Sequence, residues 1–81
     1  MPRFMDVHDD LKLPLEMIEH IADDARNGRA DAFGVRQIEL YYNAEGKVYC
    51  VLDGADEDAI RSHHAAHGVP CGDVHQVNSL A

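Results

Sequence analysis

Three of the six histidines in this 81-residue chain lie within five positions of each other, in the stretch AIRSHHAAHG at residues 59–68. In a helix, His63 and His67 are four residues apart and His64 and His67 are three apart, so that each pair shares a face. This spacing permits chelation of a metal ion. A histidine near a helix C-terminus also has a structural use, because its ring caps the last carbonyls and complements the helix dipole.

The charge balance favours cations over polyanions as partners. The formal net charge is -8, and only seven residues are Lys or Arg. Nucleic-acid binders need basic side chains to replace the counterions of phosphates, so the composition argues against a nucleic-acid partner. An acidic protein attracts cations, and its histidines change charge as the pH falls through about 6.5. Metal binding and pH sensitivity are therefore the first candidates.

The length and the cysteine count set further expectations. The 81 residues predict one domain, residues 1–81, and a domain this small buries only about 60–65% of its unfolded surface, which favours oligomerisation. The sequence has no apolar run typical of a signal peptide or a membrane span, so we expect a cytoplasmic protein with reduced thiols. Cys50 and Cys71 are then free, either for packing or for binding a metal.

Apolar periodicity predicts the element order βαββαβ. Two segments have helical spacing, and four have the alternation or the β-branched and aromatic residues of strands. The sequence NAEG between the second and third strands predicts a hairpin turn. In chain order we expect a strand at 3–8, a helix within 11–28, strands within 34–43 and 47–53, a helix within 54–68 and a last strand within 69–77.

Two split βαβ halves of this length predict a ferredoxin-like α+β fold, a four-stranded antiparallel sheet with both helices on one face. The other face is bare, and we expect Phe4, Tyr41 or Tyr42, and part of the third strand to lie on it. A face-to-face homodimer, as an α+β sandwich or barrel, covers such a face. We also expect the first and third strands to be parallel central neighbours, which brings His8 toward Cys50.

The first strand has two different sides. Met5 and Val7 point one way, while Phe4, Asp6 and His8 point the other way and form a wetter side. Contact between His8 and a residue of the third strand depends on which side of each strand faces the helices, and the sequence leaves this open.

Each candidate ligand also has a plainer role. Cys50 can be a small buried hydrophobe, since free cysteines are among the most buried residues. Ile60 belongs in the core and shares a helical stripe with His64 and His67, so we expect His64 to point inward. A lone inward histidine is usually a satisfied polar group, and the helix dipole alone explains His67. His63 lies on a neighbouring stripe.

The remaining histidines and the second cysteine are weaker candidates. His20 follows Glu16 by four residues and predicts a solvated pair. Cys71 and His75 form a C-x-x-x-H arrangement at a sheet edge, where it could bind a metal across a dimer. No spacing matches the paired C-x-x-C motif of structural zinc sites.

The residue types narrow the chemistry. Imidazole with thiolate suits nickel, copper or zinc, whereas calcium and magnesium prefer oxygen ligands, and the EF-hand spacing is absent. Cys50 and His64 could form a nucleophile and a base, but no third orienting residue and no Gly-rich phosphate loop is evident. We therefore assign no catalytic residues.

The segments FMDVH and YYNAEGKVYCVLDGADEDAIRSHHAAHGVP together resemble a family of small ferredoxin-like nickel-binding proteins, catalogued as a domain of unknown function. In that family a Tyr-rich hairpin ends in a strand with a Cys, followed by an acidic helix start, A-[VI]-R-x-x-H and G-[LV]-P. The likeness covers nearly the whole chain. The residues that carry it are Tyr41, Tyr42, Cys50, Ala59, Ile60, Arg61, His64, Gly68, Val69 and Pro70.

The resemblance implies a homodimer with a bound divalent metal, nickel(II) in the characterised type. By position it assigns His8, Cys50 and His64 as metal ligands, with His63 and His67 as additional candidates outside its pattern. We thus expect a small cytoplasmic protein that binds nickel(II) for sequestration or delivery. The alternative is a dimeric α+β-barrel enzyme or small-molecule binder that uses the open sheet face as its pocket. A third possibility is an interaction module with incidental histidines.

Overall fold

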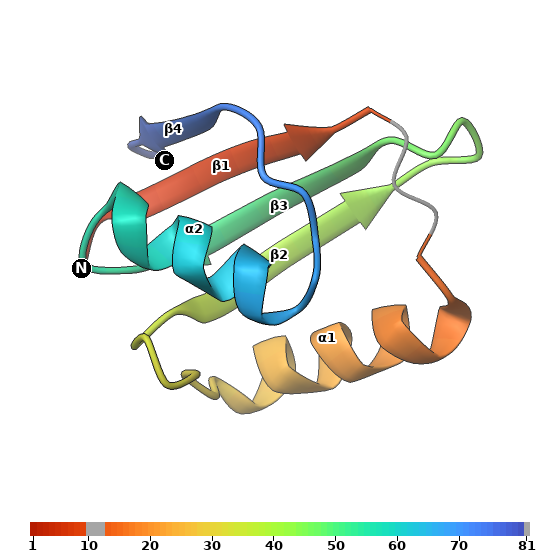
Figure 1. The fold of residues 1–81 in the computed structure, drawn as a ribbon, viewed down its shortest axis with the longest axis horizontal. Coiled ribbons are helices and arrows are strands. Elements are labelled where there is room, and N and C mark those ends of the chain that lie inside the picture. The colour runs from red at the N-terminus through yellow and green to blue at the C-terminus, as the bar shows by residue number, and fades with distance from the viewer. Residues whose placement is uncertain (10–12, 81) are drawn as a thin grey trace.

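The computed structural model describes residues 1–9 and 13–80 and has the predicted element order (Figure 1). Leu11 and Lys12, at the start of the predicted first helical segment, lie outside the described residues. All six elements fall within the predicted segments. They are β1 (Arg3–His8), α1 (Leu15–Asn27), β2 (Arg36–Tyr42), β3 (Val48–Asp53), α2 (Glu57–Ala66) and β4 (Val74–Val77).

Local sequence explains where the helices and the hairpin begin and end. α1 follows Pro14 and is capped at its C-terminus by Gly28, whose φ of 62° is the left-handed conformation that favours glycine. α2 begins after Asp56, whose Oδ1 accepts a hydrogen bond from the Ala59 N–H at 2.8 Å. In the turn between β2 and β3, Oδ1 of Asn43 accepts hydrogen bonds from two backbone N–H groups. These boundaries are set by residues close in sequence.

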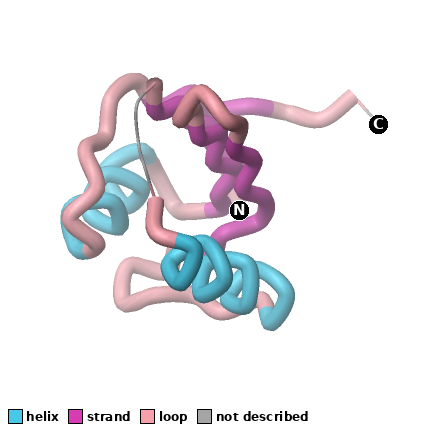
Figure 2. The backbone as a smooth tube through the Cα atoms, turned by 90° about the vertical axis from the view of Figure 1, so that its right-hand side faces the viewer, coloured by secondary structure: helices cyan, strands magenta, loops and turns pink. Residues whose placement is uncertain are grey.

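The ferredoxin-like fold is confirmed, but the predicted direction of β3 relative to β1 is wrong. The four-stranded sheet has the order β2-β3-β1-β4 and is antiparallel throughout, with both helices on one side (Figure 2). β1 and β3 are central neighbours, but they run antiparallel. The reason is that β3 forms a hairpin with β2, which runs in the same direction as β1, so β3 must oppose both. Asp6 lies opposite Cys50, and His8 lies opposite Val48.

The side of β1 with the polar residues is the buried side. Phe4, Asp6 and His8 are only 4%, 0% and 8% exposed, whereas Met5 and Val7 are 37% and 39% exposed. The prediction that Phe4 lies on the bare face is therefore wrong. Alternation determines which side chains share a face, but the placement of the helices determines which face is covered.

The sheet face away from the helices, which we call the bare face, carries an apolar group from the three strands β1, β2 and β3. Directly opposed residues share a face, and Val7 opposes Tyr49, which in turn opposes Tyr41. Met5 opposes Val51 in the same way. The prediction for Tyr41 and part of the third strand therefore holds.

The core lies between the sheet and the helices. Its buried apolar residues are Phe4, Val35, Val48, Cys50, Leu52 and Ile60. α2 packs closely, because Gly54 leaves room for Ile60. A Cβ at position 54 would lie 2.9 Å from Cδ1 of Ile60. α1, all of whose residues are described, contributes no buried residue. A cavity lined by residues of both helices and of the sheet lies on this side of the molecule.

Candidate metal centre

A buried carboxylate lies at the centre of the candidate site. Asp6 is completely buried in the middle of β1. Its Oδ2 lies 2.7 Å from Nε2 of His8, which is two residues along the same strand. The same oxygen lies 2.8 Å from Nε2 of His64 on α2. The carboxylate thus has an imidazole nitrogen from the sheet and another from the helix.

Within the described part of the chain, both carboxylate oxygens of Asp6 and Nε2 of His8 are buried and make no well-aligned hydrogen bond. Oδ2 is close enough to both imidazoles to form an ion pair when either ring is protonated. Buried polar groups normally have partners, and buried carboxylates are normally paired or bound to a cation. The ligands of a transition metal lie at about 2.0–2.2 Å from the ion, and therefore about 3 Å from each other. The residues at Asp6 fit a metal ion.

The helix itself orients the His64 ring. Nδ1 of His64 donates to the carbonyl of Ile60, one turn earlier, at 2.8 Å. This hydrogen bond directs Nε2 toward Asp6, as metal-ligating histidines are commonly oriented by their second nitrogen. Burial lowers the pKa of His64, but the Asp6 carboxylate and the Ile60 carbonyl outweigh burial and raise it above its ordinary value. A proton therefore competes strongly for the nitrogen that a metal would use.

Two thiols border the same carboxylate. The ligand atoms of Asp6, His8 and Cys50 all lie within 4.8 Å of one another, and so do those of Asp6, His64 and Cys71. Burial, followed by the negative charge of Asp6, raises the pKa of Cys50 to about 12. Cys50 is thus a neutral thiol that must lose a proton to bind a metal as thiolate. We call these five residues the inner cluster.

His63 belongs to a different group, which we call the outer cluster: Asp31, His63 and His67. Nδ1 of His63 lies 2.6 Å from Oδ2 of Asp31 in the loop before β2. Burial lowers the pKa of His63, although the Asp31 carboxylate that faces its Nδ1 acts in the opposite direction. The ring centroids of His63 and His67 are 4.7 Å apart. The side chains of His63 and Asp31 are 17% and 23% exposed, so this cluster is partly open to solvent.

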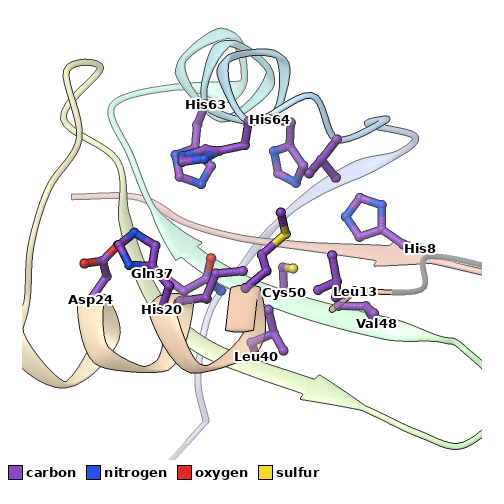
Figure 3. A pocket seen from close by; sticks show the side chains of 14 residues that line it. His8, Leu13, His20, Asp24, Gln37, Leu40, Val48, Cys50, His63 and His64 are labelled. Carbon is purple, nitrogen blue, oxygen red and sulfur yellow. The ribbon is translucent and has the colours of Figure 1, made fainter. Parts of the chain in front are cut away.

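Both clusters contribute to one cavity of about 160 Å³ between the two helices and the sheet. Figure 3 shows His8 and Cys50 beside the sheet, and His63 and His64 reaching toward them from α2. Apolar residues such as Leu40 and Val48 line the rest of it. The cavity is large enough for an ion with its water ligands or for a small organic molecule. The histidines that line it are His8, His20, His63, His64 and His67.

His20 differs from its predicted role. Its Nε2 lies 3.4 Å from Oδ2 of Asp24, not beside the predicted partner Glu16. His20 and Asp24 both line the cavity. His20 therefore contacts the acidic residue that lies on the same side of α1. This contact still leaves His20 as an exposed residue of the rim.

The structure brings His8, Cys50 and His64 to one place, but Asp6 is what joins them. The sequence interpretation put Asp6 on the wetter side of the strand. The one sequence feature that could have indicated its burial is that Asp6 shares this side with the apolar Phe4. Cys71 is also part of the site, whereas His75 belongs to no group of three or more potential metal ligands among the described residues.

Comparison with known proteins gives two findings. A family model described as "Nickel responsive protein SCO4226-like" matches residues 4–77, which confirms the resemblance noted from the sequence. The crystal structure of SCO4226 from Streptomyces coelicolor A3(2) has a TM-score of 0.74 and 21% identity, covering 98% of this chain and 99% of that chain. At this identity the likeness shows the fold alone. No curated protein matches.

No helix in the described ranges is long and apolar enough to cross a membrane.

Proposed function

Because the chain belongs to the SCO4226-like family of nickel-responsive proteins, we propose that it binds nickel(II) in the inner cluster and sequesters or delivers the ion. The observation that carries the proposal is the buried carboxylate of Asp6, which has an imidazole nitrogen at 2.7 Å and another at 2.8 Å. Taking a carboxylate out of water costs free energy, and a bound cation offsets that cost.

The types of ligand atom in the inner cluster support nickel or a similar transition metal. His8 and His64 offer imidazole nitrogens, Asp6 offers a carboxylate oxygen, and Cys50 and Cys71 offer thiols. Imidazole and thiolate disfavour magnesium and calcium, which prefer sites built from oxygen atoms. The acidic net charge of -8 helps to attract a divalent cation.

We also propose that two copies of the chain pair through the bare face. Its apolar side chains Met5, Val7 and Tyr41 are 37%, 39% and 57% exposed. Side chains of this kind on neighbouring strands favour association of two sheets. This pairing would leave the inner cluster, on the other side of the sheet, accessible from the helices.

A second candidate function is the binding of a small organic molecule. It is favoured by the cavity of about 160 Å³, which has apolar residues such as Leu13, Met17 and Ile21 in its lining. This cavity lies on the helix side of the sheet, and not on the open face where the sequence interpretation put a pocket. Protein purified without a His tag distinguishes the two functions, because stoichiometric nickel in elemental analysis favours the metal-binding function.

Titration calorimetry with nickel(II) chloride tests the metal site. The triple variant His8→Ala, Cys50→Ala, His64→Ala should lose tight nickel binding, because it keeps only Asp6 and Cys71 of the inner cluster. The matched control is His75→Ala, which removes an exposed imidazole on β4 and should bind as the unmodified protein does. Unchanged affinity in the triple variant would show that the inner cluster is not the site.

A further inference from the structure

We infer that the outer cluster of Asp31, His63 and His67 is a second divalent-metal site, separate from the inner cluster. This inference goes beyond the proposed function, because Asp31, His63 and His67 bind no ion in that proposal. The ligand atoms of these three residues lie within 4.8 Å of one another. They comprise two imidazoles and a carboxylate, a ligand set that suits nickel, zinc, cobalt or iron.

The carboxylate of this site is held in place by its own loop. Oδ1 of Asp31 accepts hydrogen bonds from the backbone N–H groups of Phe33 at 2.9 Å and Val35 at 3.0 Å. These two bonds fix the carboxyl group and leave Oδ2 to face His63. A ligand that is already oriented loses little conformational freedom when it binds an ion.

The two histidines come from the end of α2 at the spacing that lets them share an ion. His63 is in the last turn of the helix, and His67 is its C-cap residue. Residues four apart on a helix are neighbours, and this spacing is the one that places two imidazoles on a single zinc ion in helical H-E-x-x-H motifs. The 4.7 Å between their ring centroids is consistent with such sharing.

The outer cluster is distinct from the inner one although His63 and His64 are consecutive. Their rings are nearly perpendicular, at 82°, and their centroids are 5.7 Å apart. His64 contacts Asp6, whereas His63 contacts Asp31. The outer cluster contains no thiol, and its side chains are more exposed than those of His8 and Asp6, at 7% and 1%. We therefore expect weaker binding and faster exchange at the outer cluster.

Titration with cobalt(II) separates the two sites, because a thiolate ligand gives cobalt a sulfur-to-metal charge-transfer band and imidazole or carboxylate does not. Equilibrium dialysis of the full chain should give two equivalents of cobalt(II). The charge-transfer band should saturate with one of them. The double variant His63→Gln, His67→Gln should bind one equivalent and keep the band. The triple variant of the inner cluster should lose the band and still bind one equivalent.

His67→Gln alone provides a second test, because His67 is exposed and its replacement leaves the fold intact. It should weaken the second equivalent by at least about tenfold, since even removal of a residue that only orients a ligand costs about 10–100-fold in metal affinity. His75→Gln is the matched control and should bind two equivalents.

Three results would overturn the inference. A single equivalent with the charge-transfer band in the unmodified protein, or two equivalents retained in the double variant, would mean that the outer cluster binds no ion of its own. Loss of the charge-transfer band in the double variant would mean that the two clusters act as one site. Failure of the inner-cluster triple variant to lose the band contradicts the proposed function and leaves the outer site to be judged by its own variants.

Discussion

Asp6 and Met5 are consecutive residues of β1, yet Asp6 is fully buried and Met5 is 37% exposed. The helix side of this strand buries a carboxylate and an imidazole, while Met5 and Val7 face away from the helices. Burial of apolar side chains normally stabilises a fold, and burial of a charge destabilises it unless the charge is paired. This reversed distribution depends on the imidazoles of His8 and His64, which face the buried carboxylate. It is the kind of local conflict expected where a residue serves binding rather than folding.

The largest predicted effect is a difference in the free energy of unfolding between variants of two neighbouring residues of β1. Phe4→Ala removes a side chain that is 4% exposed and should lower the free energy of unfolding by about 3–5 kcal/mol. Met5→Ala, on the bare face, should cost less than about 1 kcal/mol in the monomer. Urea denaturation measures both. Equal losses for the two variants would contradict the assignment of the faces.

The next effect concerns Asp6 itself. Asp6→Asn keeps the shape of the side chain and removes the charge, so nickel affinity should fall by at least about 100-fold. The metal-free protein should lose stability at acidic pH, because the protonated His64 ring would lose the carboxylate that faces it. Calorimetric titration and thermal unfolding measure these effects. Asp9→Asn, whose side chain is 87% exposed in the unmodified protein, is the control and should leave affinity unchanged.

Nickel affinity should decrease as the pH falls from about 7.5 to 5.5, by up to about tenfold per pH unit for each proton that the ion displaces. The raised pKa of His64 means that protonation begins at a higher pH than for an ordinary imidazole. Cys50, with a pKa of about 12, carries its proton throughout this range and releases it on binding as thiolate.

Calorimetry in buffers of different ionisation enthalpy counts these protons. At the upper end of the range we expect one proton for each thiol that binds as thiolate, and at the lower end more, because the imidazoles then also release protons. An affinity that does not change with pH would rule out imidazole and thiolate ligands.

The smallest effect should come from the bare face. Val7→Lys places a charge among the apolar residues there and should raise the dissociation constant of the proposed dimer by at least about tenfold. The side chain of Val7 is already partly exposed, so the fold of the monomer should persist. Sedimentation equilibrium measures the association. An unmodified protein that stays monomeric at high concentration would refute pairing through this face.

Much of the fold could be predicted because its signals are local. The alternation in residues 3–8, the turn at Asn43 and the glycine after α1 act over a few residues, and the elements fall within the segments they predict. Two features could not be derived in this way. The direction of β3 relative to β1 depends on the hairpin as a whole, and the choice of buried face depends on where both helices pack.

The site was predictable where a local pattern determined the direction of a side chain. Ile60 predicted that His64 points inward, and His64 is 4% exposed and contacts Asp6. Asp6, Cys71 and Asp31 had no such signal. Asp6 and Asp31 have partners far away in the sequence, at His64 and His63, and Cys71 joins the site through the equally distant Asp6. Spacing along the chain carries no information on contacts of that kind.

The contact of Asp6 with His64 joins the first strand to the second helix, two elements separated by most of the chain. A cation held by both would act as a cross-link that closes a long loop, and closure of long loops removes the most freedom from the unfolded chain. The loaded protein should then resist proteases longer than the metal-free protein. Release of the ion would separate its ligands on β1 from its ligand on α2, so the lifetime of the bound ion would set how long these two elements stay linked.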